Sequence, residues 1–141
     1  MERGKSLENK FRRWMKESDV YIQRFYDAKS MGRVNAPAQP ADFWVFHDDR
    51  LTLVECKEVK SRKSLPFTSI RPSQVKGYLD VANHGGNYLL LVEINNVLYA
   101  VYMCKVYPYM KSKSFQGSIS LKWFEDNACK IKNRKEIKDW F

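Results

Sequence analysis

Cysteine and histidine are scarce in this sequence of 141 residues. The three cysteines, Cys56, Cys104 and Cys129, are far apart, and His47 and His84 each stand alone. Disulfide frameworks and zinc sites need such residues in clusters with short, regular spacings. The sequence therefore predicts neither a disulfide scaffold nor a histidine-based metal site, and we interpret both histidines as surface imidazoles.

Long apolar runs are also missing. None reaches the roughly 18 residues that cross a bilayer. The first residues, MERGKSLENKF, lack the apolar centre of a secretory leader. We therefore expect a soluble protein of the cytoplasm.

Acidic residues are too few to balance the basic ones, because 16 Asp and Glu stand against 25 Lys and Arg, a net charge of +9. Such a field favours polyanionic partners, either nucleic acid or an acidic membrane surface. The length is typical of one domain, and a hydrophobic content of 44% is enough for one compact core. We expect residues 1–141 to form a single domain with a basic C-terminal tail from about residue 130.

Apolar residues recur at helical spacing in two segments. Near the start they are Leu7, Phe11, Trp14 and Met15, with basic residues on the other side. We expect this amphipathic helix to continue through residues 21–25 after a break near Asp19. A second helix begins at Pro72, which suits a first helical position, and ends at Gly85 and Gly86. Its expected apolar stripe is Val75, Tyr78, Leu79 and Ala82.

Four segments have the composition of strands. Residues 42–46 and 51–57 flank the polar HDDR and predict an antiparallel hairpin. Residues 87–94 are apolar on both faces, as in a strand covered from both sides, and a tight Asn-Asn turn leads into 97–103. The second and third strands, with the helix between them, form a βαβ unit within a mixed sheet on which helices pack. Beyond these, only residues 120–128 indicate another helix.

Charge enters one face of the strand that follows the HDDR turn. Side chains alternate along a strand, so Glu55 and Lys57 share the face of Leu53. A buried carboxylate costs on the order of several kcal/mol unless it is paired or bound to a cation. Antiparallel pairing also places Asp42 opposite Glu55, where two carboxylates repel each other unless a cation such as Mg²⁺ neutralises them. Lys57 would then stand where an ammonium group can polarise water and face a phosphate.

These residues form a recognisable pattern. PAD at 40–42, followed by ECK at 55–57, resembles the motif of the PD-(D/E)XK nuclease superfamily. Three longer stretches, RGKSLENKF, ECKEVKSRKSLPFTSIRPSQ and GGNYLLLVEI, are similar to RecU-type and archaeal-type Holliday junction resolvases. The resemblance implies an α/β fold with a restriction-endonuclease-like mixed sheet and an αβββαβ core flanked by helices. It also implies a homodimeric endonuclease of DNA recombination and repair, which cuts branched DNA with Mg²⁺ or Mn²⁺ in a bacterial, archaeal or phage-infected cell.

The resemblance also implies roles for individual residues. Asp42 and Glu55 would bind the metal with the backbone carbonyl of Cys56, and Lys57 would be the catalytic lysine. Glu8 matches a glutamate of the first helix that supports the metal site, and Gln74 matches a glutamine that points back toward the active-site strand. The pattern alone also allows simpler interpretations: Glu8 as a solvated helix residue, Gln74 as part of its helix's first turn, and Glu55 with Lys57 as a surface pair.

Basic residues concentrate around the proposed site, where phosphates would need neutralisation. The candidates for DNA contact are Arg3, Lys5, Lys60, Arg62, Lys63, Arg71 and Lys76. Ordinary solubility is the competing explanation for these side chains. Two other functions stay open at this point, a nuclease of the same superfamily that cuts plain duplex and a DNA-binding module without catalysis.

Overall fold

The computed structural model describes residues 5–26, 38–59 and 64–141. The helices are α1 (Lys5–Glu17), α2 (Pro72–Ala82), α3 (Met103–Ser112), α4 (Leu121–Asn127) and α5 (Arg134–Lys138), with a short 3-10 turn, η1, at Phe67–Ser69. The strands are β1 (Tyr21–Arg24), β2 (Phe43–His47), β3 (Arg50–Val59), β4 (Ser64–Pro66), β5 (Asn87–Ile94), β6 (Val97–Tyr102), β7 (Ser118–Ser120) and β8 (Cys129–Ile131). Six strands form one sheet in the order β1-β2-β3-β5-β6-β8, and β4 pairs with β7.

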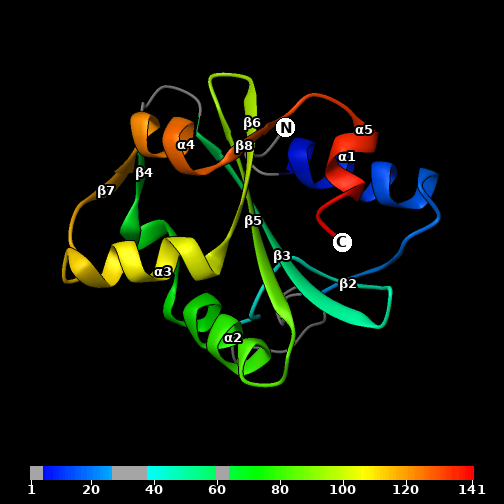
Figure 1. Ribbon diagram of the computed structural model, residues 1–141, viewed down its shortest axis with the longest axis horizontal. Coiled ribbons are helices and arrows are strands. Elements are labelled where there is room, and N and C mark those ends of the chain that lie inside the picture. The colour runs from blue at the N-terminus through cyan, green and yellow to red at the C-terminus, as the bar shows by residue number, and fades with distance from the viewer. Residues whose placement is uncertain (1–4, 27–37, 60–63) are drawn as a thin grey trace.

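Helices cover both faces of this sheet, with α1 and α5 on one side and α2, α3 and α4 on the other (Figure 1). The predicted stripe of α1 is confirmed, because Leu7, Phe11 and Met15 are buried against Val54 and Cys56 of β3. Odd-numbered residues of β3, such as Leu53, face the opposite core under α2 and α3. Alternate side chains of β3 therefore enter two different hydrophobic cores, one on each face of the sheet.

The predicted hairpin and βαβ unit are both confirmed. β2 and β3 pair antiparallel with Phe43 opposite Val54, and Asp48 and Asp49 take the left-handed conformation at the turn between them. β3 and β5 pair parallel and are joined through α2. This is the parallel pair of an otherwise antiparallel sheet, which places the charged segment of β3 beside a fully buried neighbour.

The prediction that residues 21–25 continue the first helix was wrong. Asp19 adopts a φ of 57°, which ends the helical turn, and the Val20 amide donates to the Met15 carbonyl. The chain then reverses into β1, where Ile22 pairs with Val45 and is buried beneath α1. β1 thus supplies one of the three strands of the six-stranded sheet that precede α2, so the order αβββαβ holds for this sheet and its helices.

Two features of the C-terminal part differ from the sequence pattern. Residues 103–112 form α3 although Pro108 lies inside the helix, and this interruption hid the helical spacing. The segment expected as a basic tail contributes β8, the edge strand beside β6, and then α5. Phe141 packs against the ring of Phe11, with 5.9 Å between ring centroids, so this segment belongs to the core beneath α1.

The expected apolar stripe of α2 is confirmed only in part, because Val75 and Tyr78 pack against the core. Gln74 and Gly77 are buried, whereas Leu79 is 39% exposed and Ala82 is exposed. α2 approaches Pro40 so closely that Gly77, which has no side chain, lies on the buried face of the helix. Among the described residues, no helix is both long and apolar enough to cross a membrane.

Candidate active site

Asp42 lies directly before β2 and is held by both neighbouring strands. Its amide donates to the Val54 carbonyl at 3.0 Å, and its carbonyl accepts from the Phe25 amide at 2.9 Å. The Asp42 carboxylate oxygen Oδ2 accepts a hydrogen bond of 2.8 Å from the amide of Cys56 on β3. The side chain therefore has a fixed position at the edge of β3, next to Glu55.

Glu55 and Lys57 meet on one face of β3, as the alternation predicts. Lys57 Nζ lies 3.1 Å from Glu55 Oε2 and donates to the Ser69 carbonyl at 2.6 Å. Glu55 is only 5% exposed. Burial, followed by the negative charge of Asp42, raises the pKa of Glu55 to about 7, although Lys57 opposes this shift. The two carboxylates are thus close enough to repel each other, and Lys57 compensates only part of that charge.

Glu8 reaches the same place from α1. It is 8% exposed, which excludes the interpretation as a solvated helix residue. Arg24 Nη2 of β1 lies 3.0 Å from Glu8 Oε2. The pKa of Glu8 is raised to about 8, first by burial and then by a hydrogen bond with Asp42 and the charge of Asp42. The charge of Arg24 opposes this shift. The pKa of Glu8 is therefore raised although Arg24 lies beside it, and Glu8 shares its surroundings with Asp42.

Gln74 is completely buried at the start of α2. Its Oε1 accepts a 3.0 Å hydrogen bond from the Arg71 amide, so the side chain folds back over the first turn of its own helix. Within the described residues its Nε2 has no hydrogen-bond partner. Arg71 lowers the pKa of Glu55 by its charge, which places this end of α2 beside the acidic residues. The glutamine therefore carries a buried N–H donor without a partner in the described residues, below the surface of the hollow.

An open hollow of about 620 Å³ lies beside two of these groups, Glu8 and Asp42, whereas Glu55, Lys57 and Gln74 are not part of its described lining. Its lining includes Glu8 and Asp42 together with three arginines, Arg12, Arg24 and Arg71. Sequence reasoning missed Arg24, because the segment before it was expected to be helical. Period-two alternation of Ile22 with its exposed neighbours is the signal that could have found β1. The lining of the hollow thus combines two carboxylates with a cationic rim of three guanidinium groups. This arrangement suits a metal-assisted reaction on a phosphate.

The remaining candidates for DNA contact have mixed positions. Arg71 lines the hollow, and Lys5 begins α1. Lys76 lies on the exposed side of α2 and pairs with Asp80 at 2.6 Å. Arg3, Lys60, Arg62 and Lys63 lie outside the described residues. Cys56 contributes its amide to Asp42, while burial raises the pKa of its thiol well above the ordinary value.

Asp42 and Glu55 are the pair that could hold a metal ion, with Glu8 beside them. Within residues 5–26, 38–59 and 64–141, no three His, Cys, Asp or Glu side chains are arranged to enclose an ion by themselves. A site of this kind suits a cation that keeps water in its shell and takes one or two carboxylates with phosphate oxygens, as Mg²⁺ does. It does not suit an ion that requires a complete cage of protein ligands.

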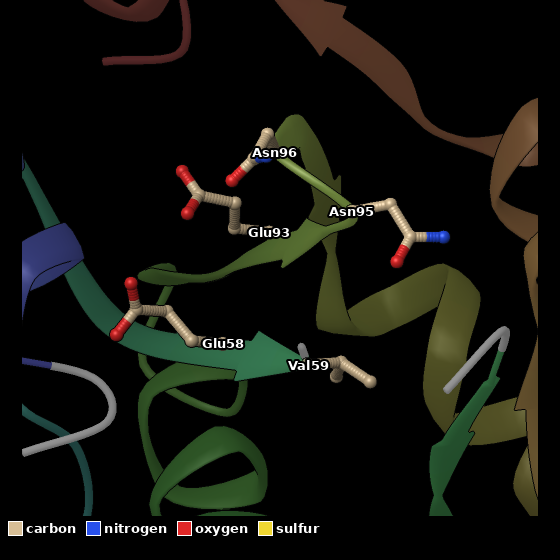
Figure 2. Close-up of a pocket in the computed structure, with 5 residues that line it drawn as sticks. All are labelled: Glu58, Val59, Glu93, Asn95 and Asn96. Carbon is tan, nitrogen blue, oxygen red and sulfur yellow. The ribbon is translucent and has the colours of Figure 1, made fainter. Parts of the chain in front are cut away.

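A second acidic hollow, of about 320 Å³, lies farther along β3 and β5. Glu58 and Glu93 are direct neighbours on the parallel strands, and their carboxylates project to the same side near Asn96 (Figure 2). Lys10 of α1 compensates Glu93, with 3.3 Å between Nζ and Oε2. The described lining of this second hollow contains no lysine or arginine, in contrast to that of the hollow beside Asp42. The cationic rim thus distinguishes the candidate active site.

Comparison with known proteins supports the fold. No protein-family model and no curated protein matches the sequence. Among solved structures, the chain is similar to that of Archaeoglobus fulgidus Hjc, a Holliday junction resolvase from an archaeal hyperthermophile. The TM-score is 0.52 at 11% sequence identity, over 94% of this chain and 99% of the other. The expected fold class, a mixed sheet flanked by helices as in this resolvase, is therefore confirmed.

Proposed function

We propose that this chain is a Mg²⁺-dependent, structure-selective DNA endonuclease that resolves four-way junctions by paired symmetric nicks. One observation carries the proposal: Oδ2 of Asp42 is bound at 2.8 Å to the amide of Cys56, the residue after Glu55, and Lys57 is held against Glu55 at 3.1 Å. The similarity in fold to a junction resolvase supports a nuclease of this kind. The net charge of +9 supports a nucleic acid as the substrate.

The residues present fit a magnesium ion. Asp42 and Glu55 would hold it, the backbone carbonyl of Cys56 would help, and Glu8 would support the site. The raised pKa values of Glu8 and Glu55 support this assignment: burial raises them first and the charge of Asp42 adds to the shift, and a divalent cation would relieve that repulsion. When bound, the ion would lower the pKa of a coordinated water and offset negative charge on the phosphate. Mn²⁺ has the same preference for hard oxygen ligands and would substitute.

Among the described residues, Lys57 is the one best placed to act on the reacting groups. Its ammonium is oriented by two fixed acceptors, Glu55 and the Ser69 carbonyl, so little freedom remains to be lost when substrate binds. A third N–H of the ammonium remains for a water molecule or a phosphate oxygen. Lys57 would hold the attacking water in line with the scissile phosphorus and stabilise the charge that develops there. By family resemblance, the product would carry a 5′-phosphate.

The arginines of the hollow would bind the phosphates on either side of the scissile bond. Arg12, Arg24 and Arg71 line the space above the carboxylates, where a guanidinium can grip phosphate oxygens with two N–H groups. Symmetric nicks in two strands require two equal sites, and a homodimer supplies them.

The decisive experiment uses a labelled synthetic four-way junction and a linear duplex of the same sequence, each incubated with and without Mg²⁺. We expect paired nicks at symmetric positions of the junction, only in the presence of the metal. Equal cutting of both substrates would indicate a nuclease of the same superfamily that acts on duplex. Binding of the junction without cleavage in Mg²⁺ or Mn²⁺ would indicate a non-catalytic DNA-binding module.

A further inference from the structure

Pro40, two residues before Asp42, is fixed from two sides by residues outside the acidic cluster. We propose that Tyr88 of β5 and Gly77 of α2 are positioning residues that clamp Pro40 and thereby set the place of the Asp42 carboxylate. The inference rests on the proposed function only for the role of Asp42. Neither residue is assigned contact with DNA or metal.

Tyr88 supplies a hydrogen bond from beneath. Its side chain is 1% exposed in the core between the sheet and α2, and its hydroxyl donates to the Pro40 carbonyl at 2.7 Å. Burial, followed by the charges of Glu55 and Asp42, raises the pKa of this hydroxyl, so it remains a donor at all relevant pH values. The bond joins a central strand of the sheet to the segment that leads into β2.

Gly77 forms the other wall. A Cβ atom at this position would lie 2.6 Å from Pro40 Cβ and 3.2 Å from the Pro40 carbonyl oxygen, the same oxygen that accepts from Tyr88. Side-chain carbon atoms do not approach each other this closely, so only glycine allows α2 to contact Pro40 in this way. Glycine inside a helix is less favourable than alanine. Its presence here is explained by the close approach.

The clamp acts on Asp42 through a short and constrained path. The ring of Pro40 fixes its own φ, and Ala41 is buried with 4% exposure. Beyond them, Asp42 is bound to Val54 through its amide and to the Cys56 amide through Oδ2. With the Pro40 carbonyl held at one end and β3 at the other, the carboxylate has little freedom to turn away from Glu55. Loss of the hydrogen bond from Tyr88 to Pro40 should therefore weaken the hydrogen bond from the Cys56 amide to Asp42.

The test compares Tyr88→Phe with Tyr102→Phe. Both replacements remove a tyrosine hydroxyl that donates to a backbone carbonyl, but Tyr102 donates to Trp140 on the far side of the sheet. Hydrogen exchange is measured for the amide of Cys56, which reports its bond to Asp42, relative to the amide of Leu91. In the metal-free protein, Tyr88→Phe should speed exchange at Cys56 about fivefold, the effect of one net hydrogen bond. Tyr102→Phe should leave the ratio unchanged.

A second measurement titrates Mn²⁺ into each protein by calorimetry and follows junction cleavage. Tyr88→Phe should weaken Mn²⁺ binding about fivefold and lower kcat, with KM for the junction unchanged, because it alters the placement of a ligand and not the DNA surface. Gly77→Ala should change both readouts in the same direction, provided that thermal unfolding shows a folded protein. Unchanged exchange at Cys56 in Tyr88→Phe would overturn the inference.

The two proposals can fail separately. If the wild-type protein neither binds Mn²⁺ nor cleaves DNA, the proposed function is wrong. The exchange ratio at Cys56 in the metal-free protein still decides whether Tyr88 holds Asp42 in place. If the wild-type protein cleaves junctions and Tyr88→Phe behaves like Tyr102→Phe in every readout, the function stands and the clamp is refuted.

Discussion

Glu8 and Arg24 form an ion pair with 3.0 Å between Oε2 and Nη2, and this pair joins α1 to β1 at the edge of the candidate active site. The two side chains are 11% and 28% exposed. Removing one partner of such a pair leaves the other charge poorly compensated, which costs more than the loss of a surface pair. We therefore expect Arg24 to have two roles: it stabilises the ionised form of Glu8, and it binds a phosphate of the DNA.

Arg24→Gln should raise the Mg²⁺ concentration that cleavage requires. Without the guanidinium, the pKa of Glu8 rises further, because the charge of Arg24 opposes the upward shift. A neutral Glu8 supports a cation less well, so we expect about a tenfold loss of kcat/KM at low Mg²⁺ and partial recovery at high Mg²⁺. Arg13→Gln is the control, because its side chain is 64% exposed and lies 3.9 Å from Glu17. Identical Mg²⁺ curves for the two variants would contradict the prediction.

Lys57→Ala should abolish cleavage while the protein still binds junctions. The replacement removes the ammonium that faces the phosphate, and we expect a loss of at least about 100-fold in the single-turnover rate. Junction affinity, measured by gel shift in Ca²⁺, should change little, because the arginines of the hollow remain. Lys122→Ala serves as the matched control, since Lys122 forms an exposed pair with Asp126 on α4. Normal cleavage by Lys57→Ala would remove Lys57 from the mechanism.

The metal-free protein should lose stability as the pH rises from mildly acidic to mildly basic. Glu8 and Glu55 titrate at an ordinary pKa of 4.5 in the unfolded chain and at about 8 and about 7 in the folded protein. Between these values the folded protein holds more protons, so the free energy of unfolding falls with increasing pH. The contribution of the two groups is complete below pH 4.5 and is lost above about pH 8.

Thermal unfolding between about pH 5 and pH 9 measures this decline. Glu8→Gln should flatten it, because the replacement cannot ionise, whereas Glu125→Gln, at an exposed position on α4, should leave it unchanged. Mg²⁺ should counteract the loss at high pH, since it binds the ionised carboxylates and stabilises the folded state. A stability that increases with pH in the absence of metal would refute the assigned shifts.

Junction binding should weaken steeply with salt, and Arg71 should account for a defined part of that dependence. Each phosphate contact contributes roughly 0.9 to the slope of log K against log salt. Arg71→Ala should therefore reduce the slope by about 1 and lower affinity for all sequences alike. Fluorescence anisotropy at several salt concentrations measures both effects. An unchanged slope would indicate that Arg71 does not contact phosphate.

Local patterns were sufficient to predict the hairpin, the βαβ unit and the meeting of Glu55 with Lys57. Each depends on alternation within one strand or on a short turn, and such patterns are visible in neighbouring residues. The opposition of Asp42 and Glu55 followed from the same turn, and the pairing of Phe43 with Val54 agrees with it. The placement of these two carboxylates on paired segments could therefore be predicted from the sequence.

The parts that were missed depend on contacts between distant residues. Tyr21, Ile22 and Phe25 fit a helical spacing as well as a strand, and only pairing with β2 decides between them. Tyr88 and Pro40 are 48 residues apart, so no local pattern links them. The burial of Gln74 and Gly77 likewise depends on what α2 meets in the folded protein. Tertiary contacts overrode local preference in each case.

The packing of Phe141 on Phe11 connects the last residue of the described chain to the helix that carries Glu8. Glu8 lies one helical turn before Phe11, so a change in size at either aromatic ring would tilt α1 and move the carboxylate. Selection on the active site should therefore extend to both rings. Across diverging relatives, we expect these two positions to change in a compensating manner, a large residue at one accompanying a small residue at the other.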